Sequence, residues 1–411
     1  MKTTSAVPAR RPRAAFAGLA VAALAAGTLA GCASSKSSGS DSKSAAAGAA
    51  SSSSSAPAGD PHRAAVSITA AEGCAVDKTT FPAGQVTFEI ANKDATAVSE
   101  VELQSGQRIV GEKENLPPGF TGSFTVAVDA GSYSLYCPGS GKPNQTLTVT
   151  GTAPTSGDSD TATLLAQGAK EYAAYVNTQM GYLVQTSQAL QAALKGSDLD
   201  AAQKAYMKAR PYYEKIEPVA ESFTSGSDNL DADIDARQGD VPDAQWGGFH
   251  RIEKGLFADK SLAGLSQYGD TLVTNVQKLQ SLTAGLEYKP FELANGAQEL
   301  LDEVSSSKIT GEEERYSHID LLDFQGNDEG AEQAFADLKP ALQKIDPALT
   351  GSISDAFTAL DKLVDGYRSG DNASGFALYS SLQDADKQKL AAAVKAVQEP
   401  LSQVAAKVTK S

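Results

Sequence analysis

The feature that most constrains this chain is a change of hydrophobic period between residues 150 and 161. Within residues 62–150, short segments such as QVTFEIAN and GSFTVAVD alternate apolar and polar residues and are separated by Gly, Pro and Asn. This pattern is typical of a small β-sandwich or barrel. From residue 161 onward, apolar residues recur every three or four positions, which predicts amphipathic helices. The sequence therefore predicts a multidomain protein: an all-β domain (62–150), a linker (151–160) and an all-α helical bundle (161–411).

The N-terminus has the pattern of an export signal. Three arginines at positions 10, 11 and 13 precede an apolar run that ends in Leu29-Ala30-Gly31-Cys32. A basic region, a short apolar region and small residues at the cleavage point define a secretory signal. Its end resembles a bacterial lipobox, which implies cleavage before Cys32 and attachment of a lipid to its sulfur. We therefore predict a lipoprotein signal peptide (1–31) and a place on the outer face of the cell membrane, with Sec or twin-arginine export left open.

A low-complexity segment follows the signal. Residues 33–60 contain no Leu, Ile, Val or aromatic residue, so they cannot bury enough apolar area to offset the entropy cost of ordering. We predict a disordered Ser/Ala/Gly tether over residues 32–61, which holds the folded part away from the membrane.

The charge balance excludes some classes of partner. The whole chain has a net charge of −15. Loss of the signal removes four basic residues, which leaves 31 basic and 50 acidic residues and a net charge of −19. Nucleic-acid binding and polybasic membrane attachment both need a basic surface. The mature chain suits cations as ligands.

The helical region contains acids and a histidine at metal-binding spacing. Glu214 and Glu217 are three residues apart, as are His250 and Glu253, so each pair shares a helix face. The aspartate-rich segment DADIDAR lies between the pairs. Because such a shell of imidazole and carboxylates has no thiolate, it suits iron, manganese or zinc better than Cu(I).

Four segments of the helical region resemble the imelysin family: ARPYYEKIEPVAE, DADIDARQGD, GFHRIEKGLF and SKITGEEERYSHIDLLDFQGNDEGA. Residues 62–411 as a whole resemble the EfeO-type components of EfeUOB iron-uptake systems, in which a cupredoxin-like domain precedes the imelysin-like one. The resemblance implies a lipid-anchored protein without enzymatic activity that captures iron and passes it to an EfeU-type membrane permease. It also implies an EfeB-type haem peroxidase as a partner. Fe²⁺ and Fe³⁺ stay open as the bound ion, with zinc or copper as alternatives.

The resemblance also implies which side chains hold the metal. Asp231 and Asp235 are rivals for one position, because DADIDAR offers several acids. The implied ligands are Glu214, Asp231, His250 and Glu253, with Glu217, Asp235, Glu313 and Glu329 as auxiliary acids.

The β domain resembles a cupredoxin-like domain that lacks the usual copper ligands. The loop CPGSGKPN begins with Cys137 but contains no His or Met, and Glu100 stands about where the upstream histidine would be. A blue-copper site with two histidines and a cysteine is therefore excluded. In an exported protein, Cys74 and Cys137 are expected to form a disulfide; alternatively, their thiolates join Glu100 or Glu102 in a second metal site.

Two other functions remain alternatives. A metal-dependent hydrolase using the HxxE motif would need an open coordination position and a general base, and no HExxH, GxSxG or P-loop motif occurs in the chain. Some imelysin-like relatives bind alginate, which implies an acidic-polysaccharide-binding protein; at net charge −19 such binding would need bridging cations.

Overall fold

The computed structural model describes residues 60–98, 100–113, 116–152, 159–225 and 229–409. The predicted signal peptide, Cys32 and nearly all of the predicted tether lie outside these residues. The β-strands are β1 Arg63–Thr69, β2 Gly73–Val76, β3 Thr80–Pro82, β4 Gly84–Asn92, β5 Val101–Ser105, β6 Arg108–Lys113, β7 Thr121–Val128, β8 Gly131–Tyr136 and β9 Gln145–Thr150.

These strands form the predicted two-sheet sandwich. One sheet has the order β2-β1-β4-β7 and the other β3-β9-β8-β5-β6. The β1–β4 and β3–β9 pairs are parallel. Along β4, Val86, Phe88 and Ile90 are buried at alternate positions, as the period of two requires. Phe88 faces Phe124 of β7 in the register, and their stacked rings have centroids 4.9 Å apart.

A disulfide joins Cys74 on β2 to Cys137 directly after β8, with 6.3 Å between their Cα atoms. Of the two alternatives for these cysteines, the structure contains the bridge. Bonded to each other, the two sulfurs are not thiolate ligands, so a second metal site with both cysteines would require reduction of the bridge. Glu102 on β5, one of the acids named for that second site, accepts a hydrogen bond from Gln104 Nε2 at 2.6 Å.

The described chain from residue 159 onward is predominantly helical, as predicted. The helical segments are α1 Ser159–Leu194, α2 Leu199–Glu214, α3 Glu217–Glu221, α4 Leu230–Ile234, α5 Gly248–Glu253, the π-helix η1 Lys254–Ala258, α6 Ser266–Thr283, α7 Pro290–Ser306, the 3₁₀ turn η2 Lys308–Thr310, α8 Asp320–Ile345, α9 Pro347–Asp365, the 3₁₀ turn η3 Tyr379–Ser381, α10 Asp384–Leu401 and α11 Val404–Thr409.

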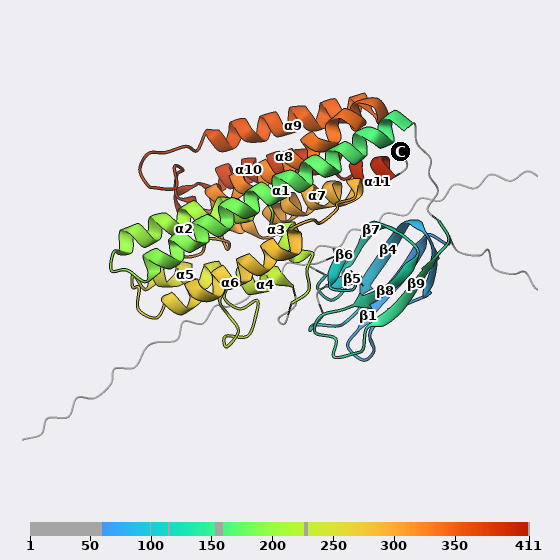
Figure 1. Ribbon diagram of the computed structural model, residues 1–411, viewed down its shortest axis with the longest axis horizontal. Helices are drawn as coiled ribbons and strands as arrows, with labels where there is room; N and C mark the ends of the chain where they lie inside the picture. The colour runs from blue at the N-terminus through green and yellow to red at the C-terminus, as the bar shows by residue number, and fades with distance from the viewer. Residues whose placement is uncertain (1–59, 99, 114–115, 153–158, 226–228, 410–411) are drawn as a thin grey trace, which may run out of the picture. The chain divides into compact units, whose positions relative to one another are not determined.

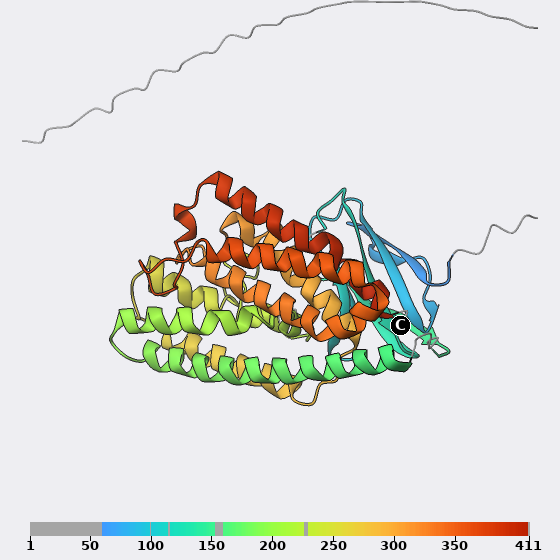
Figure 2. The ribbon, with the colours of Figure 1, turned by 90° about the horizontal axis from the view of Figure 1, so that it is seen from above.

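The long helices form a bundle around α8. Helix α1 packs against α2, α6 and α8, and α8 also packs against α2, α7 and α9. Helices α1 and α2 run side by side in both views (Figures 1 and 2). Residues such as Met180, Leu183 and Leu338 are buried in the core. Among the described helices, none has both the length and the apolar character needed to cross a membrane.

Two glycines allow close approaches that bring the functional side chains together. Gly248, the first residue of α5, has a φ of +68°, and a Cβ there would lie 2.0 Å from the Ile234 carbonyl oxygen at the end of α4. At Gly326 of α8, a Cβ would lie 2.5 Å from the Cβ of Glu214. A larger residue at either position would separate α5 from α4, or α8 from α2.

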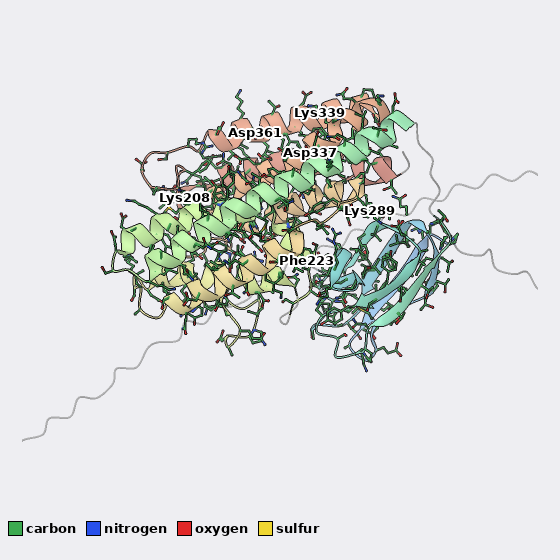
Figure 3. All side chains as sticks on the ribbon, in the orientation of Figure 1. Lys208, Phe223, Lys289, Asp337, Lys339 and Asp361 are labelled. Atoms are coloured by element: carbon green, nitrogen blue, oxygen red, sulfur yellow. A yellow bond between two sulfur atoms is a disulfide. The ribbon has the colours of Figure 1, made fainter. Side chains whose placement is uncertain are left out.

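A hydrogen-bonded pair of acids, one buried and one partly exposed, links α8 to α9. Asp328 on α8 is 4% exposed, and its carboxyl is hydrogen-bonded to Asp361 on α9, which is labelled in Figure 3. Burial, followed by the charge of Asp361 and a hydrogen bond to it, raises the pKa of Asp328 to about 9. The Asp328 carboxyl therefore keeps its proton at neutral pH and donates it to the Asp361 carboxylate.

Replacement of this acid should stabilise the protein in a pH-dependent way. The pKa of Asp328 in the folded chain, about 9, lies above its unfolded value of about 3.9. Its contribution to stability is therefore complete below the unfolded value and is lost as the pH rises through the folded one. Asp328→Asn keeps a donor without a titrating group, so we expect it to gain stability relative to wild type as the pH rises, by up to about 4 kcal/mol between pH ~5.5 and pH ~8.5.

Thermal unfolding followed by circular dichroism at several pH values measures this difference. Asp355→Asn, at an exposed position on the same helix as Asp361, is the matched control and should show no trend. A stability difference that is constant with pH, or that falls as the pH rises, would contradict the prediction.

Candidate metal centre

Short helices and turns of the bundle bring a set of acids and one histidine to a single buried place. Glu214 ends α2, Glu217 begins α3, and Asp235 follows the last residue of α4. His250 lies on α5, and Glu313 lies in the turn between η2 and α8. Each of these five residues is at most 5% exposed. Carboxylates are rarely buried to this extent unless they are paired or hold a metal.

Two overlapping groups of side chains can each reach one ion. Glu214, Glu217, Asp235 and Glu313 each offer an oxygen, and these atoms lie within 4.8 Å of one another. Asp235 and Glu313 satisfy the same criterion together with His250. Within the described residues, both groups that meet this criterion belong to the helical region. The combined donor set is oxygen-rich with one imidazole, which suits iron, manganese or zinc.

The HxxE spacing fixes the orientation of the histidine ring. Nδ1 of His250 lies 3.2 Å from Oε2 of Glu253. The other oxygen of Glu253 accepts hydrogen bonds from the backbone N–H groups of Tyr316 and Ser317, both at 2.7 Å. Nε2 of His250 therefore faces Glu313 at 3.3 Å and Asp235 at 3.6 Å. Carboxylates behind metal-binding histidines commonly hold the ring in this way.

Arg210 neutralises part of the acid cluster. The side chain is fully buried on α2 and lies 5.2 Å from the centroid of the Phe249 ring. Its guanidinium makes ion pairs with five carboxylates: Glu214, Asp235, Glu313, Glu314 and Asp323.

Lys308 is the second buried cation. Its Nζ lies 2.8 Å from Glu214 Oε2 and 2.7 Å from Glu217 Oε2. Because an unpaired buried charge is strongly destabilising, these cations make the acid cluster compatible with a folded core.

Burial raises the pKa of each acid and neighbouring positive charge lowers it, and the net direction differs from one acid to the next. Burial would raise the pKa of Glu313, but Lys308, His250 and Arg237 hold it well below its usual range. Arg210 and His250 likewise outweigh burial at Asp235 and lower its pKa. Burial dominates at Glu217, whose pKa is raised well above its usual value. Asp235 and Glu313 are therefore the acids that are most firmly ionised and ready to accept a cation.

His250 carries a proton in this arrangement. Burial alone would lower the pKa of His250, but Asp235, Glu253 and Glu313 together raise it well above its usual value. A metal ion at Nε2 would displace that proton, because only the neutral imidazole binds metals.

The structure separates the two rival aspartates. Asp235 belongs to both ligand groups, whereas Asp231 belongs to neither and accepts a hydrogen bond from the hydroxyl of Tyr213. Burial and the charge of Asp235 raise the pKa of Asp231 to about 8. Asp231 contacts Tyr213, whereas Asp235 contacts Arg210 and His250.

The other residues implied by the sequence are placed as follows. Glu217 and Glu313, expected as auxiliary acids, belong to the larger ligand group, and Glu253 is bonded to the histidine rather than included in either group. Glu329 has a 41% exposed side chain and pairs with Lys215 at 2.5 Å, outside both groups. The ligand assignments themselves stay predictions.

Comparisons with known proteins agree with this architecture. The family model described as imelysin matches residues 168–404, and the model of a cupredoxin-like domain matches residues 44–149. Proteins named "Iron uptake system component EfeO" from Escherichia coli strain K12, E. coli O157:H7 and Shigella flexneri are each 37% identical over 352 residues, which cover 84% of this chain and 92% of the relative. The chain therefore belongs to the imelysin family, in the EfeO type that joins a cupredoxin-like domain to an imelysin domain. Although the imelysin model also carries a peptidase name, these relatives are named for iron uptake.

Substitution of the two rival aspartates should distinguish them. Asp235→Asn removes a firmly ionised oxygen from both ligand groups, so we expect the affinity for Zn²⁺ or anaerobic Fe²⁺ to fall about 10-fold or more. Asp231→Asn replaces a carboxyl that is largely protonated at neutral pH, and we expect a change of about 3-fold or less. Calorimetric titration of both variants measures the difference; a larger loss in Asp231→Asn would contradict the assignment.

Glu253 should act through the histidine. In Glu253→Gln the side-chain oxygen can still accept the two backbone N–H groups, while its NH₂ group faces Nδ1 and favours the tautomer with the proton on Nε2. We therefore expect metal affinity to fall about 10- to 100-fold. The matched control is Glu312→Gln, which changes an exposed acid paired with Arg315 and should leave affinity unchanged. Wild-type affinity in Glu253→Gln would show that the glutamate does not orient the ring.

Proposed function

We propose that this protein is an exported, lipid-anchored component of an iron-uptake system, which captures iron at the buried carboxylate–histidine centre and delivers it to a membrane permease. The observation that carries the proposal is the convergence of Glu214, Glu217, Asp235 and Glu313 within 4.8 Å of one another. The orientation of Nε2 of His250 towards Asp235 and Glu313 adds a nitrogen donor. The names of the relatives support iron as the cargo.

The donor set is consistent with iron in either oxidation state. Carboxylate oxygens and one imidazole bind both Fe²⁺ and Fe³⁺. Zinc or copper can compete for the same donors, because the affinity of such a site for divalent metals follows the Irving–Williams order, in which Cu²⁺ and Zn²⁺ bind more tightly than Fe²⁺. We propose iron as the physiological ion and zinc or copper as competitors. Selectivity would then depend on the charge and geometry of the cluster and on metal supply.

We propose that the chain does not catalyse covalent chemistry. A metal hydrolase would need a general base next to a metal-bound water. Glu214 and Glu217 are the acids that could serve, but both accept the ammonium of Lys308 at 2.7–2.8 Å. Both also belong to the group of potential ligands, and a carboxylate that binds the ion is not free to act as the general base.

The delivery step requires partners at the membrane. We propose attachment through a lipid on Cys32, with an EfeU-type permease as the acceptor of iron and an EfeB-type haem peroxidase as the second partner. A tether over residues 32–61 would let the folded part reach them.

Metal titration tests the proposal directly. The mature chain is stripped of metal and titrated with Fe²⁺ under anaerobic conditions and with Zn²⁺. We expect one ion to bind tightly, and Glu214→Gln/Glu217→Gln to lose affinity by about 100-fold or more. Glu312→Gln serves as the control. Cells that lack the chain should take up radiolabelled iron again when complemented with wild type but not with the double variant; normal uptake with the double variant would refute the proposed site.

A further inference from the structure

Lys308 lies inside the candidate metal centre rather than beside it. Its ammonium contacts Glu214 and Glu217 at 2.8 and 2.7 Å, and lies 3.4 Å from Glu303 and 3.7 Å from Glu313. Three of these four acids belong to the larger group of potential ligands. The side chain is 0% exposed, so bulk solvent does not reach the ammonium and the surrounding acids balance its charge. The ammonium thus uses the same oxygens that an ion would need.

Arg210 contacts many of the same acids but is held differently. Its planar guanidinium also pairs with Glu314 and Asp323, which lie outside both ligand groups, and its contact with the Phe249 ring adds a further restraint. Several directional bonds hold a guanidinium in place, whereas a lysine is a point charge on a flexible four-carbon chain. Of the two cations, Lys308 is therefore the less restrained.

We propose that Lys308 is a tethered competitor of the transported ion, and that it weakens ion binding and sets the charge preference of the site; this inference rests on the proposed function. When an ion arrives, the ammonium gives up Glu214 and Glu217. When the ion leaves, the ammonium returns. The exchange avoids a state in which Glu217 has lost its cation and Glu214 has only Arg210, which would be destabilising, and it makes release easier.

The competitor also affects which ion is preferred. Repulsion between the ammonium and a bound ion is proportional to the charge of the ion. A nearby positive charge therefore disfavours a trivalent ion more than a divalent one. Because the displaced ammonium stays near the ion on its side chain, the site is biased towards Fe²⁺ relative to Fe³⁺.

The substitution Lys308→Met tests the inference, because methionine retains much of the apolar length but has no charge. We would titrate the mature chain with Zn²⁺ and with Ga³⁺, two ions that do not change oxidation state during the titration. We expect Zn²⁺ to bind about 10-fold more tightly than to wild type, and Ga³⁺ about 30-fold more tightly, because the electrostatic gain scales with ion charge. The control is Lys215→Met, which removes a lysine paired with Glu329 outside the ligand groups and should change neither affinity.

A second measurement uses the wild-type chain, in case the variant does not fold. Nuclear magnetic resonance of protein with isotope-labelled lysine side chains follows the ammonium of Lys308, assigned from its absence in Lys308→Arg. We expect Zn²⁺ to shift or remove this resonance in proportion to occupancy. The inference is overturned if the resonance stays unchanged while Zn²⁺ binds, or if folded Lys308→Met binds both ions no more tightly than wild type. If wild type binds neither ion, the proposed function fails instead.

Discussion

The helical domain depends on the neutralisation of buried carboxylates by two buried cations. Arg210 and Lys308 together contact Glu214, Glu217, Asp235 and Glu313, each of which is at most 5% exposed. Without such partners the desolvation penalty would be several kcal/mol for each ion. The same requirement that makes the cations necessary for folding makes the cluster receptive to an external cation. Structure and function therefore rest on one charge balance.

The acids of this cluster come together because they lie at the ends of helices and in turns, not because they share one face of a single helix. Glu214 and Glu217 are three residues apart, but the chain leaves α2 between them and re-enters a helix at α3. Asp235 follows the end of α4, and Glu313 lies in a turn. The close approach at Gly248 brings α5 against α4, and the one at Gly326 brings α8 against α2. A π-helix, Lys254–Ala258, follows directly after Glu253, and such irregular turns often occur at functional sites.

Much of the fold could be predicted from the sequence, because the spacing of apolar residues is a local signal: every second position in strands, and every third or fourth in helices. The candidate site was predictable in part: the HxxE spacing and the acids at 214, 217 and 313 lie in the segments that resemble the imelysin family. The resemblance favoured Asp231 over Asp235, whereas the structure brings Asp235 and not Asp231 into the groups of potential ligands. The neighbours of each acid depend on tertiary contacts that the sequence does not show. Arg210 and Lys308 were also missed, although ARPYYEKIEP and SKITGEEERY contain them. A basic residue in a helical sequence is usually solvated, and only tertiary contacts show that these two are buried.

X-ray absorption spectroscopy of the iron-loaded mature chain tests the central claim most directly. The account predicts a first coordination sphere of oxygen and nitrogen, with one imidazole contribution that disappears in His250→Ala and no sulfur. A sulfur contribution would place the ion at the cysteines of the β domain, and an imidazole signal unaffected by His250→Ala would place it at another histidine. Either result would contradict a carboxylate–histidine centre in the helical bundle.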